Sequence, residues 1–463
     1  MSTESTLRQL ITAPLRQTAQ ALQSGEVSSI ALTEQCLREA RRSDGEGSRV
    51  FTRLLEEQAL ASAQASDVLL RAGLPRSLLE GVVIAVKDLF DVAGLTTMAG
   101  SIAMRGEAPA KKDAVIVNRL RQAGAVIIGL TNMTEFAFSG LGLNPHYGTP
   151  RNPWDRQTGR IPGGSSSGSA VAVTDAMTCA AIGTDTGGSV RIPSALCGLT
   201  GFKPTARRID QTGTLPLSTS LDSIGPLART VDCCALLDAV MVGHLDRPPV
   251  RPASVETMVL GLPRQLFMDG MDDEVAHAFS RARERLEKAG ARIVDLDMPE
   301  IQELPHINRA GGLSPAEAWA WHEDLLERKA NDYDPRVMAR IRRGATQSAR
   351  DYIEIVRARA DWIRRVNERL EQVDALIAPT VPRIAPEVAM LEKDDDLYVS
   401  TNMLMLRNPS VINFLDGCAV SLPCHQPGQA PVGLMLACSG DRDERLLSLA
   451  KACEAVLSGG HSR

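Results

Sequence analysis

The chain has few aromatic residues and lacks the patterns that mark membrane or secreted proteins. Aromatic side chains make up 3% of its 463 residues, so the core must be built from aliphatic side chains. No run of 18 apolar residues is present, so no transmembrane helix is expected. The N-terminal segment has no charged-then-apolar signal pattern. We therefore expect a cytoplasmic protein with no membrane partner.

The charge balance and the cysteine spacing argue against nucleic-acid binding and against a metal centre. The net charge of −5 gives no basic footprint, so nucleic acid is not an expected partner. Nine cysteines occur without CxxC spacing, which is typical of small buried hydrophobic residues in a reducing compartment. The segment GGSSSG is not followed by GK[ST], and no Rossmann fingerprint is present. We expect no metal and no cofactor.

Strand and helix patterns alternate along the chain. Residues 81–88 form an apolar run rich in valine and isoleucine, which is typical of a buried strand. Residues 113–132 follow a helix, glycine, strand plan with Gly124 at the helix end, and residues 273–299 repeat this plan with Gly290. This alternation predicts an α/β fold around a large, mixed but largely parallel sheet that is covered on both faces.

The second half of the chain adds a long helical region and then returns to the sheet. Residues 314–375 keep an apolar spacing near 3.6, which predicts helices packed on a core. Residues 376–386 have the character of a strand and a loop. No repeat or long linker separates parts of the chain, so we expect a single α/β/α domain.

Two serine clusters and one lysine are the candidates for chemistry. Ser165 in GGSSSGS and Ser189 in TDTGGS are 24 positions apart, and Lys87 ends the apolar run GVVIAVK. Amide hydrolysis needs a hydroxyl that loses its proton during attack and donors that hold the resulting oxyanion. A desolvated lysine can act as the base, because burial lowers its pKa. Glycines before a serine let successive backbone N–H groups converge, here those of Thr186, Gly187 and Gly188.

Each of these features has an ordinary explanation when taken alone. A segment rich in glycine and serine is usually a flexible loop, and a lysine after a strand is usually solvated. No histidine lies near either serine cluster in the sequence, but sequence distance does not exclude a histidine-based triad. The combination of the three segments is much more specific than any one of them.

The segments GGSSSGSAVAV and GTDTGGSVRIPSALCGLTGFKPT resemble the signature of the amidase signature family. IAVKDLFDVAGLTTMAG resembles the lysine segment of that family, and PVGLMLACSGDRDERLLSLA resembles a late family segment. The resemblance covers most of residues 15–245 and 374–456. It implies one amidase domain over residues 1–463, with a signature core at about 75–245, a variable helical insert at about 246–375 and a C-terminal return to the core at about 376–456.

The resemblance implies a role for each matching residue. Ser189 is expected to be the nucleophile, Ser165 the bridging serine after a cis Gly164–Ser165 peptide, and Lys87 the base. Further expectations concern supporting and binding residues. Asp185, Arg191 and Ser169 are expected to support the site, and Gly140, Leu141 and Gly142 to line the acyl side of the pocket through backbone groups.

The expected substrate is a small molecule that carries an amide or a urea-type C–N bond. The alternative is the A subunit of a tRNA-dependent amidotransferase, which feeds ammonia to a partner. Such subunits carry an acidic residue about seven positions before an asparagine, and here the counterparts are Leu406 and Asn413, which weakens the alternative. Arg340 is either a solvated helix arginine or a contact for a substrate carboxylate. A homodimer is left open.

Overall fold

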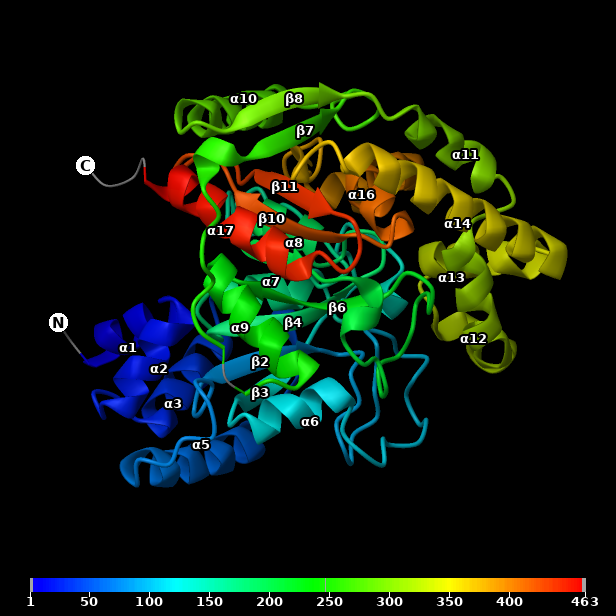
Figure 1. Cartoon of the computed structure of the whole chain (residues 1–463). Coiled ribbons are helices and arrows are strands. Elements are labelled where there is room, and N and C mark those ends of the chain that lie inside the picture. Colours follow the sequence, from blue (N-terminus) through cyan, green and yellow to red (C-terminus); the bar gives the residue numbers. More distant parts are fainter. Residues whose placement is uncertain (1–2, 246, 460–463) are drawn as a thin grey trace.

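A computed structural model describes residues 3–245 and 247–459 and shows one continuous sheet with helices around it (Figure 1). In the described residues eleven strands pair in the order β1-β3-β2-β4-β6-β5-β10-β11-β9-β7-β8. In chain order the strands are β1 (Phe51–Leu54), β2 (Val83–Lys87), β3 (Val126–Thr131), β4 (Ala180–Asp185), β5 (Thr200–Lys203), β6 (Ser223–Ala228), β7 (Val259–Pro263), β8 (Arg292–Leu296), β9 (Ala375–Pro379), β10 (Cys418–Pro423) and β11 (Gly433–Cys438). The two ends of the chain thus contribute to the same sheet.

The α-helices divide into two layers that cover the sheet and an arm at its side. In chain order they are α1 (Thr3–Ile11), α2 (Leu15–Gln23), α3 (Ser29–Ala40), α4 (Gly47–Val50), α5 (Glu56–Arg71), α6 (Val115–Gln122), α7 (Ser167–Thr174), α8 (Arg191–Cys197), α9 (Val231–Val242), α10 (Asp273–Lys288), α11 (Leu304–Ile307), α12 (Leu313–Lys329), α13 (Pro335–Arg342), α14 (Ala349–Leu370), α15 (Val388–Lys393), α16 (Asp395–Phe414) and α17 (Asp443–Ser458). Helices α7, α8 and α16 pack together against the middle strands, and α9, α10 and α17 form a second connected layer. The expected α/β/α architecture is confirmed.

Strand β2 shows why an uninterrupted apolar run is needed at the centre of the sheet. It lies between β3 and β4 and is parallel to both. Val83, Ile84 and Val86 have no exposed surface. A parallel strand covered by helices on both faces has no polar side, so its sequence is continuously apolar. Gly124, with φ of +89°, lets the chain leave α6 and enter β3, as the sequence predicts.

The expected mixed sheet is confirmed, but its parallel share is smaller than the sequence suggested. Among the described strands four pairings are parallel and six are antiparallel. The helix, glycine, strand plan reveals only strands that are linked through a helix. Strands β10 and β11 are joined by a short loop, and a short loop can only join antiparallel neighbours.

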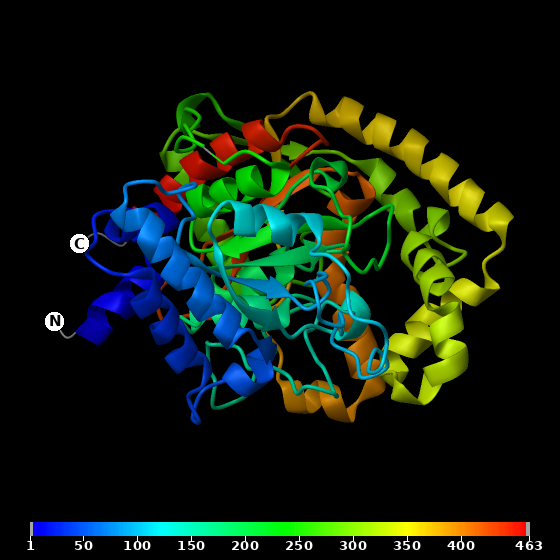
Figure 2. The ribbon, with the colours of Figure 1, turned by 90° about the horizontal axis from the view of Figure 1, so that it is seen from below.

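Helices α11 to α14, residues 304–370, form what we call the helical arm. Figures 1 and 2 both show the arm on the side of the molecule that lies opposite the N-terminal helices α1 to α3. The predicted helical region at residues 314–375 is therefore confirmed. Residues 246–375 are not entirely helical, because β7 and β8 from this segment extend the edge of the sheet. The arm is thus attached to strands of the same sheet that carries the signature segments.

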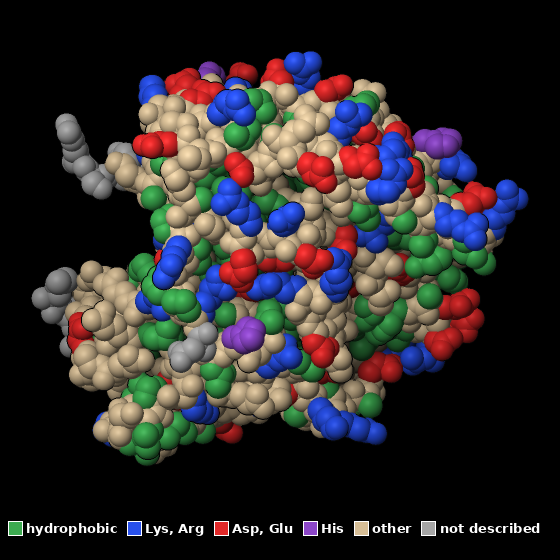
Figure 3. All heavy atoms as spheres, in the orientation of Figure 1, with side chains coloured by type: hydrophobic (Ala, Val, Ile, Leu, Met, Phe, Trp, Pro, Cys, Tyr) green, Lys and Arg blue, Asp and Glu red, His purple; other side chains and the backbone are tan. Residues whose placement is uncertain are grey.

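The distribution of surface charge and the burial of the cysteines agree with what the composition predicts. On the face shown in Figure 3, basic and acidic side chains are interspersed and do not gather by sign. No helix within residues 3–245 and 247–459 is long and apolar enough to cross a membrane. The nine cysteines are free thiols, and all except Cys424 are buried.

If the arm and the sheet form one cooperative unit, removing a buried side chain of the arm should destabilise the whole protein. Trp362 of α14 is fully buried and its Nε1 donates to the Glu300 carbonyl at 2.6 Å. We expect Trp362→Ala to lower the free energy of unfolding by about 3–5 kcal/mol within a single transition in chemical denaturation. Val356→Ala on the same helix is the control, because Val356 is 43% exposed. A separate early transition of the arm would contradict the single domain.

Candidate active site

The candidate site lies where three central strands come together. Lys87 is the last residue of β2, and Asp185 is the last residue of β4, its parallel neighbour. Strand β6 runs antiparallel to β4, and its first residue, Ser223, pairs with Asp185. The carboxyl ends of parallel strands are where open α/β sheets place their ligands. The fold therefore brings Lys87, the segment after Asp185 and the segment before Ser223 to one place.

The Lys87 amine is buried in a polar niche with two hydroxyl partners. Its side chain has no exposed surface, and Nζ donates to Ser165 Oγ at 2.6 Å and to Thr184 Oγ1 at 2.9 Å. Burial lowers the pKa of Lys87 from 10.5 to about 7, while the charges of Asp222 and Asp185 act in the opposite direction. Near neutral pH the amine can therefore exist without its proton and can accept one from Ser165.

The two serines lie in separate turns, Ser165 just before α7 and Ser189 between β4 and α8. The Gly164–Ser165 peptide is cis, as the family resemblance implies. Ser165 is fully buried, whereas Ser189 is 3% exposed and lines a cavity. The Ser166 amide donates to the Ser189 carbonyl at 3.3 Å, which holds the two segments together. Among the described residues no hydrogen bond joins the two hydroxyls, so the second link of the proton path stays a prediction.

Asp185 and Arg191 form a fully buried ion pair that organises the turn around Ser189. Asp185 accepts from Arg191 Nε at 3.0 Å and Nη2 at 2.8 Å, and from the backbone amides of Gly188 and Val190. Asn413 donates to the Asp185 carboxylate and accepts from Arg191. Burial alone would raise the pKa of Asp185, but the Arg191 charge and its hydrogen bonds hold that pKa well below 3.8. Asp185 and Arg191 are thus both a salt bridge and a frame for the serine turn.

The turn from Thr186 to Ser189, which we call the oxyanion loop, is fixed from several sides. Ser410 of α16 donates to the Gly187 carbonyl at 3.3 Å, and Thr186 Oγ1 donates to Asp222. The Gly188 amide donates to Asp185 at 2.8 Å, so this group is used differently from the oxyanion role predicted for it. For the amides of Thr186, Gly187 and Ser189 the described chain offers no acceptor. These three amides remain for a ligand oxygen.

For two other groups of predicted site residues, the structure shows contacts that differ from those expected. Ser169 does not bond Ser165 directly; its hydroxyl pairs with Thr131 Oγ1 at 2.7 Å, on the strand next to Lys87. The segment Gly140–Gly142 lies behind the pocket wall, because Leu141 is buried in the core and the Gly140 amide is used by Asn402. The pocket is lined instead by the preceding residues 137–139.

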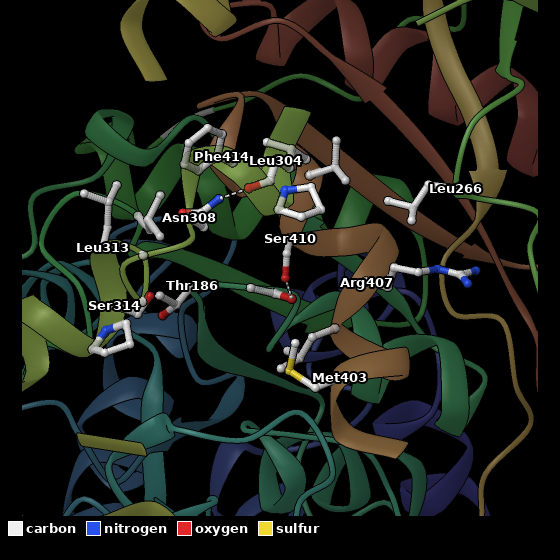
Figure 4. A pocket seen from close by; sticks show the side chains of 18 of the residues that line it. Thr186, Leu266, Leu304, Asn308, Leu313, Ser314, Met403, Arg407, Ser410 and Phe414 are labelled. Atoms are coloured by element: carbon white, nitrogen blue, oxygen red, sulfur yellow. Dashed lines mark hydrogen bonds between the residues drawn. The ribbon is translucent and has the colours of Figure 1, made fainter. Parts of the chain in front are cut away.

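A cavity of about 1010 Å³ opens in front of Ser189. Its inner wall consists of the oxyanion loop, residues 137–139 and α16, and its outer wall comes from the arm and the segment before it. Figure 4 shows side chains from the core, such as Thr186 and Ser410, and from the arm, such as Leu304, Asn308 and Leu313, around this cavity. The cavity can hold a substrate considerably larger than a simple primary amide.

The chain matches one known family over most of its length. The family model described as Amidase matches residues 31–447. The chain belongs to the amidase signature family. It is 34% identical to 2-amino-5-chloromuconic acid deaminase of Comamonas testosteroni over 97% of each chain. It is also 34% identical to the A subunit of glutamyl-tRNA(Gln) amidotransferase from Chromohalobacter salexigens, over 94% of this chain and 95% of that one. A solved amidase structure has 32% identity and a TM-score of 0.86, covering 96% of this chain and 100% of that chain.

The protein is therefore an amidase, a hydrolase that acts on carboxamide-type C–N bonds. Its site contains residues that the sequence did not single out. Thr184, the second hydroxyl on Lys87, lies in an apolar strand, and only its position two residues before Thr186 gives a hint. Asp222 stands in the family-like segment LSTSLDSIGPLARTVDC, but only the β4–β6 pairing shows that it reaches the oxyanion loop.

Proposed function

We propose that this amidase hydrolyses its substrate through an acyl-Ser189 intermediate, with Ser165 as the proton bridge and Lys87 as the base. The observation that carries the proposal is the buried Lys87 amine at 2.6 Å from the Ser165 hydroxyl, next to the cavity into which Ser189 opens. A buried lysine with a lowered pKa is a suitable general base near neutral pH. A hydroxyl between base and nucleophile can pass on a proton without moving.

In the first half of the reaction, Ser189 Oγ attacks the carbonyl carbon and its proton passes to Ser165, which gives its own proton to Lys87. The oxyanion accepts hydrogen bonds from the amides of Thr186, Gly187 and Ser189. The C–N bond then breaks, and the proton returns from Lys87 through Ser165 to the leaving nitrogen. In the second half, water attacks the acyl ester through the same path, which releases a carboxylic acid and regenerates Ser189.

The cavity favours a substrate with an anionic group. Arg340 of α13 lines the cavity and lies over the Phe138 ring at 4.6 Å. In the described residues no carboxylate lies within ion-pair distance of Arg340, and burial lowers its pKa from 12.5 to about 10. A guanidinium that is partly desolvated and without a protein counter-ion gains most from a substrate carboxylate. The relative named for a muconic acid derivative supports this class of substrate.

Leu406 favours a free-standing hydrolase over an amidotransferase component. It occupies the counterpart of the position that is acidic in amidotransferase A subunits. Here the side chain lines the cavity and lies against Gly140 and Gly187. An apolar side chain at this place offers no counter-charge to the ammonium group of glutamine. We infer that the enzyme needs no partner to release ammonia or an amine.

The roles of the three residues can be separated by single substitutions in the purified chain, assayed by ammonia or amine release from small amides. Ser189→Ala should abolish turnover, and Lys87→Met should reduce it by several orders of magnitude, because nucleophile or base is lost. Ser165→Ala should retain more activity, since water can partly bridge the gap. Ser167→Ala is the control, because its hydroxyl only approaches the Asn132 carbonyl at 3.5 Å. Near-native turnover in Ser189→Ala would refute the proposed nucleophile.

The pH dependence should follow the proton on Lys87. The neutral amine is the active form, and burial lowers its pKa from 10.5 to about 7. We therefore expect kcat/KM to be lost below this pKa, to rise through pH 7 and to level off above it. The rate of Ser189 labelling by a fluorophosphonate should show the same limb. A rate that still climbs between about pH 9 and 11, where an ordinary lysine titrates, would contradict a buried neutral base.

Arg340→Met should raise KM for amides that carry a carboxylate by roughly 10- to 100-fold, the value of a charged hydrogen-bonded contact. Neutral amides of the same size should be affected much less, because they do not use the charge. Arg342→Met is the matched control, since Arg342 is exposed on the same helix and does not line the cavity. Equal losses for anionic and neutral amides would show that Arg340 acts through packing alone.

A further inference from the structure

Asp222 is a buried carboxylate that joins the oxyanion loop to a neighbouring turn. It is 4% exposed and accepts from Thr186 Oγ1, from the Leu217 amide at 2.9 Å and from the Ser218 amide at 3.0 Å. One oxygen therefore holds the oxyanion loop, and the other holds the turn formed by residues 217–221. These contacts fix the position of each segment relative to the other.

Glu317 of α12 holds the same turn from the side of the helical arm. Its Oε2 accepts from Ser218 Oγ at 2.7 Å and from the Ser220 amide at 3.0 Å. Its Oε1 accepts from the Tyr352 hydroxyl of α14 at 2.8 Å. Glu317 thus connects two helices of the arm to a turn of the core.

These bonds form a series that runs from Tyr352 through Glu317 and the 217–221 turn to Asp222 and Thr186. We call this series the carboxylate relay. The core end of the relay, Thr186, lines the cavity, and residues 313–315 at the start of α12, the helix that carries Glu317, line it on the arm side. Leu217 and Leu221 of the connecting turn line it as well. A substrate in the cavity can therefore contact the oxyanion loop, the 217–221 turn and the start of α12.

Building on the proposed function, we propose that Asp222 and Glu317 are positioning residues that tie the oxyanion loop to the helical arm. Through this tie, the contacts of a substrate with the arm stabilise the loop geometry that holds the oxyanion. Rate depends steeply on such geometry, since a misplacement of about 1 Å can cost roughly 100-fold. The hydrogen bonds of the relay resist displacement of the loop, because a displacement that breaks one of them leaves a buried donor or acceptor without a partner, which costs free energy.

Carboxylates are well suited to join the oxyanion loop, the 217–221 turn and the arm, because several donors converge on each of them. A carboxylate accepts several donors at once, and Asp222 and Glu317 together accept three backbone amides that point into the turn. The charge of Asp222 also reaches the base, because it is the first of the charges that raise the pKa of Lys87. The other charge acting on Lys87 is that of Asp185, which is paired with Arg191. Burial raises the pKa of Asp222 to about 6, and the nearby Glu317 adds to this increase.

The central experiment breaks the relay at each end. Thr186→Val removes the hydroxyl with little change of shape, and Thr186→Ser restores it. Glu317→Ala cuts the link to the arm. We expect Thr186→Val and Glu317→Ala each to lower kcat by roughly 10- to 100-fold with a smaller effect on KM, and Thr186→Ser to recover most of it. Glu323→Ala, an exposed position on the same helix, is the control and should match the wild type.

The double variant Thr186→Val with Glu317→Ala distinguishes a relay from two local effects. Links in series give a double variant no slower than the slower single variant, whereas independent effects on log kcat add up. The rate of Ser189 labelling by a fluorophosphonate is measured in parallel, because it needs no knowledge of the substrate. Full additivity, or unchanged kcat in a folded Thr186→Val, overturns the relay.

Asp222→Asn tests the effect of the Asp222 charge on the pH dependence of kcat/KM, which a purely structural role of Asp222 would not change. Without the Asp222 charge the pKa of Lys87 should fall further, so the ascending limb of kcat/KM should shift to lower pH. An unshifted limb in an active Asp222→Asn would count against the role of this charge.

The two proposals also fail in different ways. If the wild type shows neither turnover nor Ser189 labelling, the proposed function is wrong. If the wild type shows both, but the variants have the same kcat and labelling rate as the wild type, only the relay is wrong.

Discussion

The structure depends on one costly arrangement, a lysine amine that is fully buried at the end of a central, apolar strand. Water stabilises a charged ammonium strongly, so a fully buried lysine is kept there only if it is neutral or well partnered. Lys87 meets this condition with two hydroxyl groups and no direct carboxylate among the described residues. Its place at the end of β2, between two parallel strands, removes water from every side. The fold thus lowers the pKa of this amine by excluding solvent, as the proposed role of base requires, and the large aliphatic core is what makes that exclusion possible.

If Lys87 is to act as the proposed base, the buried charges around it must not hold its proton. The strongest acid of the site, Asp185, is matched by Arg191 and Asn413, and its remaining capacity is filled by backbone amides. A carboxylate saturated in this way shapes the serine turn while its charge acts on Lys87 only from a distance. Buried ion pairs of this kind add little net stability, because the desolvation cost offsets the attraction. Their value here is geometric, since removal of either partner would leave the other charge unpaired next to the turn that carries Ser189.

The sequence indicated the parts of the site that lie within single segments and missed those that arise from pairing. Lys87, Ser165 and Ser189 stand in glycine-rich or apolar settings that are visible in the chain. An apolar run predicted β2, and helix, glycine, strand patterns predicted β3 and β8. The antiparallel partners β6, β10 and β11 have no such local signal, so the parallel share of the sheet was overestimated. For the same reason Asp222 was missed: it reaches Thr186 only because β6 runs antiparallel to β4. The Gly188 amide was assigned to the oxyanion because glycine spacing does not reveal that Asp185 already accepts from it.

Chemistry and recognition are built from different parts of the chain. Lys87, the proposed base, ends β2, and the oxyanion loop with Ser189 follows β4, so both are anchored directly to the central sheet. The outer wall of the cavity comes from the helical arm, which packs on α16 through the contact between Trp362 and Phe414. Changes in the arm can therefore alter the cavity while the hydrolytic geometry is preserved. That freedom has a limit, because the arm also contacts the turn that holds the oxyanion loop, so a new substrate must be accommodated without loosening Glu317 from residues 218–220.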